Sequence, residues 1–263
     1  MIRGKLIAAL VVMIPMWAMI PLTDHIHAER FRLKHGGAHV NRSLRTQIGQ
    51  GMAIGLLAGF RGVVADFLWI QSHGFWEKKE WLRQYRDMEV VVTLQPQSTL
   101  FWDAGAWHMA WNIGYAVSVD TNVYTHAQGL QRQRQWWERA EEFLKRGIDN
   151  VPNQYDLYFS LAWLYQEKFK DFCQAEWYFT KAASFPSAPA YIARMQARAQ
   201  ERCGDIKGAY AYWIELWSQD RSTGKQDWHI IEREIKRLED VLNLADRQRV
   251  FPKQPESNSP PAP

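Results

Sequence analysis

Two adjacent windows of the sequence match at a constant offset, from position i to position i + 34, which leaves few folds open to the chain. The matched positions are apolar or small: Tyr158 and Ile192, Leu161 and Met195, Tyr165 and Ala199, Ala175 and Ala209, Phe179 and Trp213, Ala182 and Leu216. Each window predicts two amphipathic helices, residues 156–168 and 172–184 and then residues 189–202 and 206–218. The sequences KDF and GDI form the turns between them. Because no segment alternates with the two-residue period of a strand, we expect an all-α protein.

The same spacing continues toward the N-terminus. The offset relates Leu68 to Trp102 and Phe75 to Met109, which predicts two earlier repeats. The prolines that close these repeats, Pro96 and Pro152, differ by 56 in number rather than by 34, so the second repeat carries an insertion of about 22 residues. We place it at about residues 118–134. This segment is polar and contains Asp120, Asn122 and Gly129, so it is expected to be a loop.

This pattern resembles the tetratricopeptide repeat, a helix-turn-helix of about 34 residues with an Ala early in the second helix and a Pro that closes it. Ala175 and Ala209 match that Ala, Pro152 and Pro186 match that Pro, and Gln84 stands where the first repeat should have Ala. The resemblance implies a right-handed helical solenoid of about four repeats over residues 63–220. Apolar residues at 228, 231, 235, 238 and 242 predict a capping helix within residues 226–246. The Pro-rich tail, residues 251–263, is expected to be disordered.

Three longer strings are similar to a group of bacterial membrane-anchored tetratricopeptide proteins. They are GFRGVVADFLW, LQPQSTLFWDAGAWHMAWNIGYAV and YFSLAWLYQEKFKDFCQAEWYF. In that group a G-F-R-G segment precedes D/N-x-L-W, and an A-W-N-M-A-Y-N-I run follows. The likeness covers about residues 59–181, and His108 and Trp111 depart from the Asn and Tyr of that run. It implies the repeat fold and a membrane anchor, but no activity.

An uncharged run at residues 6–22, LIAALVVMIPMWAMIPL, follows Arg3 and Lys5. It predicts a transmembrane anchor within residues 1–24. A cleaved signal peptide is the alternative, but Ile26 occupies a position where a cleavage site needs a small side chain. Basic residues lie on both sides of the anchor, so their distribution does not indicate its orientation in the membrane clearly. The short tail before the anchor and the large domain after it favour a single-pass protein of the bacterial inner membrane with a periplasmic repeat domain.

Between the anchor and the repeats, residues 25–62 include an apolar helix with glycines at Gly51, Gly55 and Gly59. Ten residues span only about 15 Å as a helix, and Arg61 and Asp66 follow directly, so a second membrane span is excluded. The glycine spacing makes one helix face smooth enough for a neighbouring backbone to approach closely. That neighbour is either the repeat array, which we favour, or the bilayer or a transmembrane helix of a partner protein.

The repeat pattern also brings the two cysteines together. Cys173 begins the second helix of the third repeat, and Cys203 ends the first helix of the fourth. These helices are antiparallel neighbours in a stack of repeats, so the thiols are within reach of each other. A disulfide would suit an oxidising compartment, and two buried free thiols are the alternative.

Composition and motifs argue against several function classes. The net charge of +4 is small and evenly spread, so we expect no nucleic-acid partner. Asp24, His25, His27 and Glu29 form a polar cluster after the anchor, which is typical of a solvated linker rather than a metal site. No phosphate-binding loop or nucleophile elbow is present, and the histidines at 73, 108 and 126 have no partners at motif spacing. We therefore expect neither an enzyme nor a cofactor.

In tetratricopeptide proteins, the first helix of each repeat lines a concave groove. The resemblance therefore implies a partner-binding groove formed by Asp66, Trp69, His73, Trp76, Asp103, Trp107, Asp156, Phe159, Trp163 and Gln166. Aromatic anchors beside carboxylates suit an apolar segment that carries Lys or Arg. Alternatively, the segment before Phe60 or residues 123–130 fill the groove from within the chain. The other tryptophans of these repeats, at 102, 111, 136 and 137, are expected in the core or in helix seams.

Three functional hypotheses remain. The first is a membrane-anchored scaffold for protein–protein interactions, which holds a component of a cell-envelope assembly of the pilus or secretion type. The second is a module that binds a glycan or a cell-wall fragment by stacking sugars on the tryptophans. The third is an accessory subunit that docks on a membrane complex through the strip of Gly51, Gly55 and Gly59.

Overall fold

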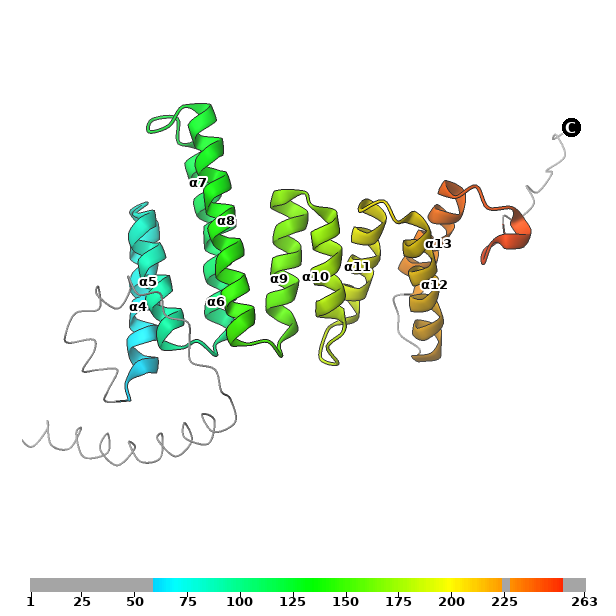
Figure 1. Ribbon diagram of the computed structural model, residues 1–263, viewed down its shortest axis with the longest axis horizontal. Coiled ribbons are helices and arrows are strands. Elements are labelled where there is room, and N and C mark those ends of the chain that lie inside the picture. Colours follow the sequence, from blue (N-terminus) through cyan, green and yellow to red (C-terminus); the bar gives the residue numbers. More distant parts are fainter. Residues whose placement is uncertain (1–58, 224–227, 253–263) are drawn as a thin grey trace, which may run out of the picture. The chain divides into compact units, whose positions relative to one another are not determined.

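The computed structural model describes residues 59–223 and 228–252 (Figure 1). Every regular element in these residues is a helix, which agrees with the all-α prediction. The predicted anchor, most of residues 25–62 and residues 253–263 lie outside the described part of the chain. None of the described helices has the length and apolar character needed to cross a membrane.

The helices form two compact units, residues 1–152 and residues 153–263, which we describe separately. Unit 1 contains α4 (Arg61–Glu77), α5 (Trp81–Leu94), α6 (Thr99–Trp107), the π-helix η1 (His108–Ile113), α7 (Gly114–Val119) and α8 (His126–Asn150). The segments α6, η1 and α7 follow one another without a break, so they make one long helix with a π-helical turn in its middle. It packs against α8, and α4 packs against α5.

Glycines let the long helix and α8 approach closely. A Cβ at Gly105 would lie 2.8 Å from the ring of Phe143, and a Cβ at Gly147 would lie 2.9 Å from the ring of Trp102. The rings of Trp102 and Phe143 contact each other, with centroids 4.8 Å apart. Each helix therefore supplies one small and one large residue to the same seam, so the large ring of one helix packs against the glycine of the other.

The predicted insertion, residues 118–134, is mostly helical instead of a loop. Helix α7 continues to Val119 and α8 begins at His126, so only six residues connect them. Thr125 and Gln128 form a capping box that starts α8. Gly129 is buried where α8 meets α7, since a Cβ there would lie 3.0 Å from the carbonyl oxygen of Ser118. The segment is polar because much of its helical surface is exposed, which composition alone does not distinguish from a loop.

Unit 2 contains α9 (Tyr155–Leu164), the π-helix η2 (Tyr165–Phe169), α10 (Phe172–Ala183), α11 (Ala190–Arg202), α12 (Ile206–Thr223), α13 (Trp228–Val241) and the 3₁₀-helix η3 (Asp246–Gln248). Each helix from α9 to α12 packs against the next α-helix in the chain. The four helices predicted from the repeat offset are present and end within a few residues of the expected positions.

Residues that are related by the 34-residue offset have similar local geometry. Asp171 and Asp205 are related by the offset, and each accepts a hydrogen bond from the N–H three residues later, at 3.0 and 2.9 Å. The residues before them, Lys170 and Gly204, both have positive φ, 56° and 106°. In unit 1, Lys79 takes the same place before α5, with φ 58°. The KDF and GDI turns therefore share a positive-φ residue followed by a capping aspartate.

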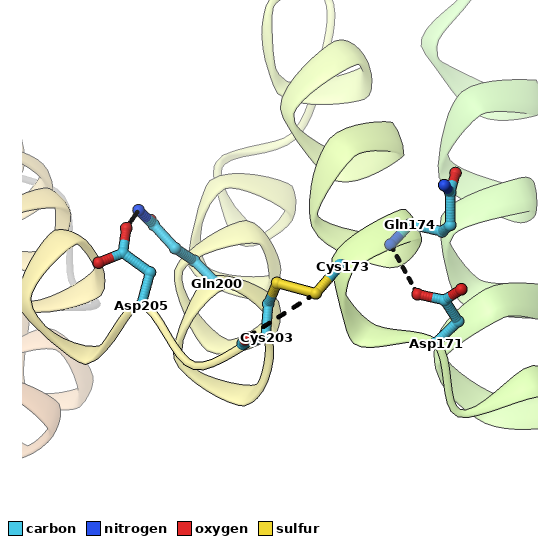
Figure 2. The surroundings of a disulfide bond; sticks show 6 residues. All are labelled: Asp171, Cys173, Gln174, Gln200, Cys203 and Asp205. Carbon is cyan, nitrogen blue, oxygen red and sulfur yellow. Dashed lines mark hydrogen bonds between the residues drawn. A yellow bond between two sulfur atoms is a disulfide. The ribbon is translucent and has the colours of Figure 1, made fainter.

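Cys173 and Cys203 are joined by a disulfide, with their Cα atoms 4.8 Å apart (Figure 2). The bond joins the start of α10 to the end of α11. Of the two possibilities that the sequence left open, the structure has the bonded form. Both cysteines are exposed, so neither is a buried thiol.

Helix α13 buries Ile231, Ile235 and Leu238 in one cluster with Trp213 of α12. It agrees with the capping helix expected within residues 226–246. The chain then turns back, because the Glu239 carboxylate accepts a hydrogen bond from the N–H of Val250 at 2.6 Å. Phe251, which the sequence assigns to the disordered tail, packs its ring 5.2 Å from that of Trp217.

A candidate aromatic binding site around His108

The first turn of the π-helix η1 places a histidine among aromatic rings from two helices. Four rings surround His108, with centroid distances of 6.3 Å to Trp69, 5.7 Å to His73, 6.5 Å to Trp76 and 5.5 Å to Trp107. We call these five residues the His108 cluster. The structure thus brings together four of the predicted groove residues, and their common neighbour is a residue that the groove prediction omitted.

The groove prediction omitted His108 because it carried over only those positions of the first helices that the offset of 34 relates. The groove positions at His73 and Trp107 obey the repeat offset of 34, whereas His73 and His108 differ by 35.

His108 is held in one orientation and in its neutral form. The side-chain amide nitrogen of Asn112, also in η1, lies 2.9 Å from Nδ1 of His108 and donates a hydrogen bond to it. The neutral ring therefore carries its proton on Nε2. Burial, together with a smaller contribution from the charge of the nearby His73, lowers the pKa of His108 to about 4. At pH 7 the centre of the cluster is uncharged.

The cluster has a buried base and an exposed rim. His108 is only 9% exposed, and the half-buried Trp69 packs against Phe101 with ring centroids 5.2 Å apart. Trp76 and Trp107 are 39% and 50% exposed, and His73 is exposed as well. Two large indoles are thus available to solvent beside an uncharged, buried imidazole.

Two carboxylates lie near the rim along the same helices. Asp66 is exposed on α4, three residues before Trp69, and Asp103 is half-buried on α6, four residues before Trp107. Residues three or four apart lie on one helix face, so each carboxylate shares a face with an indole of the cluster. The site therefore combines apolar area with negative charge at its edge.

The groove residues predicted in unit 2 are less available. Phe159 and Trp163 stack with centroids 6.3 Å apart, and Phe159 also contacts Phe179 and Tyr191. Gln166 is buried, and its amide donates to the Glu167 carboxylate at 3.0 Å, so its predicted place in an open groove is wrong. Gln166 lies in the first turn of η2.

The remaining predicted residues of unit 2 and of the glycine strip have these positions. Asp156 is half-buried in the first turn of α9, where burial and a hydrogen bond to its carboxylate raise the pKa of Tyr155. Gly59 is exposed with φ 82°, whereas Gly51 and Gly55 lie outside the described residues. Trp102 and Trp136 are buried as expected, and Trp137 donates from Nε1 to the carbonyl oxygen of Ala110 at 3.2 Å.

Among the residues that the structure describes, no group of three or more His, Cys, Asp or Glu side chains could hold a metal ion. No protein-family model matches the chain, and no curated protein matches it.

Proposed function

We propose that this protein is a membrane-anchored scaffold of tetratricopeptide type, and that the His108 cluster binds an apolar segment of a partner protein. The partner would be a component of a cell-envelope assembly of the pilus or secretion type. The observation that carries the proposal is the pair of exposed indoles, Trp76 on α4 and Trp107 on α6, which both contact the buried His108.

The chemistry of the cluster suits an apolar ligand. Tryptophans are the residues that most often dominate binding energy at protein interfaces, because each buries a large, rigid area. The neutral His108 can be covered without desolvating a charge, which would be costly. Asp66 and Asp103 favour a segment that carries Lys or Arg beside its apolar residues.

The binding test compares two tryptophans of similar exposure. Trp107→Ala should weaken capture of partner proteins by about 1–3 kcal/mol, as loss of an interface anchor does, and should leave the melting temperature nearly unchanged. Trp177 is 48% exposed on α10 and outside the cluster, so Trp177→Ala is the matched control. Capture by the full-length chain would be quantified by cross-linking in membranes and mass spectrometry. Equal losses in both variants, or a large fall in melting temperature for Trp107→Ala, would contradict the proposal.

A glycan is the second candidate ligand, because exposed indoles beside carboxylates can also stack sugars. The dependence of binding on salt concentration distinguishes a protein ligand from a glycan. Binding of a cationic protein segment should weaken as ionic strength rises, whereas sugar stacking should change little.

The disulfide supports a location for the repeat domain. Exposed disulfides persist in oxidising compartments such as the periplasm and are rare in the cytosol. We therefore propose a periplasmic repeat domain held at the inner membrane by residues 1–24. Protease added to intact spheroplasts should digest a C-terminal tag, and Cys173 and Cys203 should resist alkylation until reduced. A protected tag with free thiols would place the domain in the cytoplasm.

A further inference from the structure

Helix α4 carries an apolar stripe that no described residue covers. Val63, Phe67 and Ile70 are 67%, 66% and 71% exposed, and their spacing of four and three residues places them on one face. The core-facing residues of the same helix are Ala65, Leu68 and Ser72. At about 100° per residue, the stripe lies nearly opposite the core-facing side.

The stripe is separate from the His108 cluster. The same step of about 100° per residue places the α4 residues of the cluster between the stripe and the core-facing side of the helix. These residues are Trp69, His73 and Trp76. A segment bound to the stripe would therefore leave the cluster open. This inference does not depend on the proposed function of the cluster.

A helix at the end of a packed array normally presents a polar outer face. Helix α13 does so, because it buries Ile231, Ile235 and Leu238 and exposes Arg233, Lys236 and other charged residues. The outer face of α4 is apolar instead, and a contiguous apolar patch on a folded chain marks a surface that something else covers.

We propose that residues 51–58 of this chain, GMAIGLLA, cover the stripe as a helix antiparallel to α4. Gly59 has φ 82°, the conformation that commonly ends a helix, and α4 begins two residues later. Such a short connection is typical of two antiparallel helices. Eight residues span about 12 Å as a helix, which matches the rise of about 11 Å from Val63 to Ile70.

The composition of this segment fits the stripe. Gly51 and Gly55 are four residues apart, so they make a smooth helix face that leaves room for the large side chains of Phe67 and Ile70. The two-residue connection also gives the segment a high effective concentration at the stripe, which a second copy or another protein lacks. An anionic lipid surface is disfavoured, because Asp66, the exposed charged residue beside the middle of the stripe, is acidic.

Cysteine cross-linking in the full-length chain tests the contact. The chain has only two cysteines and both are bonded, so Gly51→Cys with Phe67→Cys introduces the only free thiols. The matched control is Gly51→Cys with Asp66→Cys, at the same level on α4 but off the stripe. Diamide would form the bond, and trypsin cleavage after Arg61 would separate the two linked peptides for mass spectrometry.

We expect a link within one chain that forms on the order of tenfold faster with position 67 than with position 66. Links between two chains would assign the stripe to a second copy and overturn the proposal. Equal rates at the two positions would overturn it as well.

A second variant keeps the test independent of the engineered bond. Phe67→Lys should lower the melting temperature of the full chain by several degrees, because it places a charge under the covering segment. Leu82, 59% exposed on α5, is the control position, where Leu82→Lys should have little effect. An unchanged melting temperature in Phe67→Lys would mean that nothing covers the stripe.

Discussion

At the scale of single residues, a buried ion pair joins two helices of unit 1. Arg146 of α8 donates two hydrogen bonds to the Glu89 carboxylate of α5, at 2.9 and 2.5 Å. The Glu89 side chain is only 5% exposed, and the Arg146 guanidinium also lies over the ring of Trp102. Burial raises the pKa of Tyr85, and the charge of Glu89 raises it further. A hydrogen bond to the Glu89 carboxylate raises it as well, so this buried carboxylate is held by Arg146 and Tyr85 together.

Breaking this pair should cost much more than breaking an exposed one. Arg146→Met leaves the Glu89 charge buried without its main partner, so we expect a loss of about 3–5 kcal/mol in the free energy of unfolding. The control is Arg83→Met, which removes the exposed pair between Arg83 and Glu80 and should cost about 1 kcal/mol or less. Urea unfolding of both variants measures the difference. Similar losses would mean that the buried pair contributes no more than a surface pair.

His108 should make stability depend on pH. The unfolded chain protonates this residue near its ordinary pKa of 6.5, whereas the folded chain does so near 4. The unfolded state therefore binds more protons between these values, and the contribution of His108 to stability is full above pH 6.5 and falls as the pH drops toward 4. The slope is at most about 1.4 kcal/mol per pH unit.

The test compares wild type with His108→Asn, since Asn does not titrate. Burial raises the pKa of Asp87 to about 6, which has the opposite effect on stability, so only the difference between the two proteins isolates His108. Urea unfolding at about pH 7.5 and about pH 4.5 should show wild type losing more stability than the variant. A constant difference between the proteins would show that His108 titrates normally.

At the scale of helices, close approach in unit 1 depends on small residues. The long helix from α6 to α7 meets α8 at Gly105, Gly114, Gly129 and Gly147, where an added Cβ would lie 2.8 to 3.1 Å from its nearest neighbour. At Gly105, Gly114 and Gly147 that neighbour belongs to a large aromatic side chain of the opposite helix. The hairpin therefore tolerates little added volume.

Two Gly→Ala substitutions should change the stability of the protein in opposite directions. Gly147→Ala places a methyl group against the Trp102 ring, and overpacking of this kind costs about 1–3 kcal/mol. Gly74 lies in α4 with nothing within 4 Å of an added Cβ, so Gly74→Ala should stabilise by about 0.5–1 kcal/mol through better helix propensity. Thermal unfolding of the two variants checks both signs, and destabilisation by Gly74→Ala would show that its surface is covered.

At the scale of the whole molecule, the disulfide is the covalent link between hairpins of unit 2. It closes a loop over a sequence separation of 30 residues. By the chain-entropy relation, a loop of this length contributes about 3–4 kcal/mol, mainly by restricting the unfolded chain. Stability of this unit should therefore depend on redox conditions.

Hydrogen exchange should locate that effect. After reduction and alkylation of Cys173 and Cys203, we expect faster amide exchange in α10 and α11 and little change in α5 and α8 of unit 1. Mass spectrometry of the oxidised and reduced chains measures it peptide by peptide. Unchanged exchange in α10 and α11 would mean that helix packing alone holds these hairpins together.

The sequence by itself determined the helical class and the turns of unit 2, because these depend on local interactions. The apolar period, the aspartates that cap α10 and α12, and the positive-φ positions before them act within a few residues. Only tertiary structure decided the candidate site. The packing of His108 against rings of α4, the burial that keeps it neutral and the helical form of residues 126–134 depend on contacts between distant segments, which a local pattern does not contain.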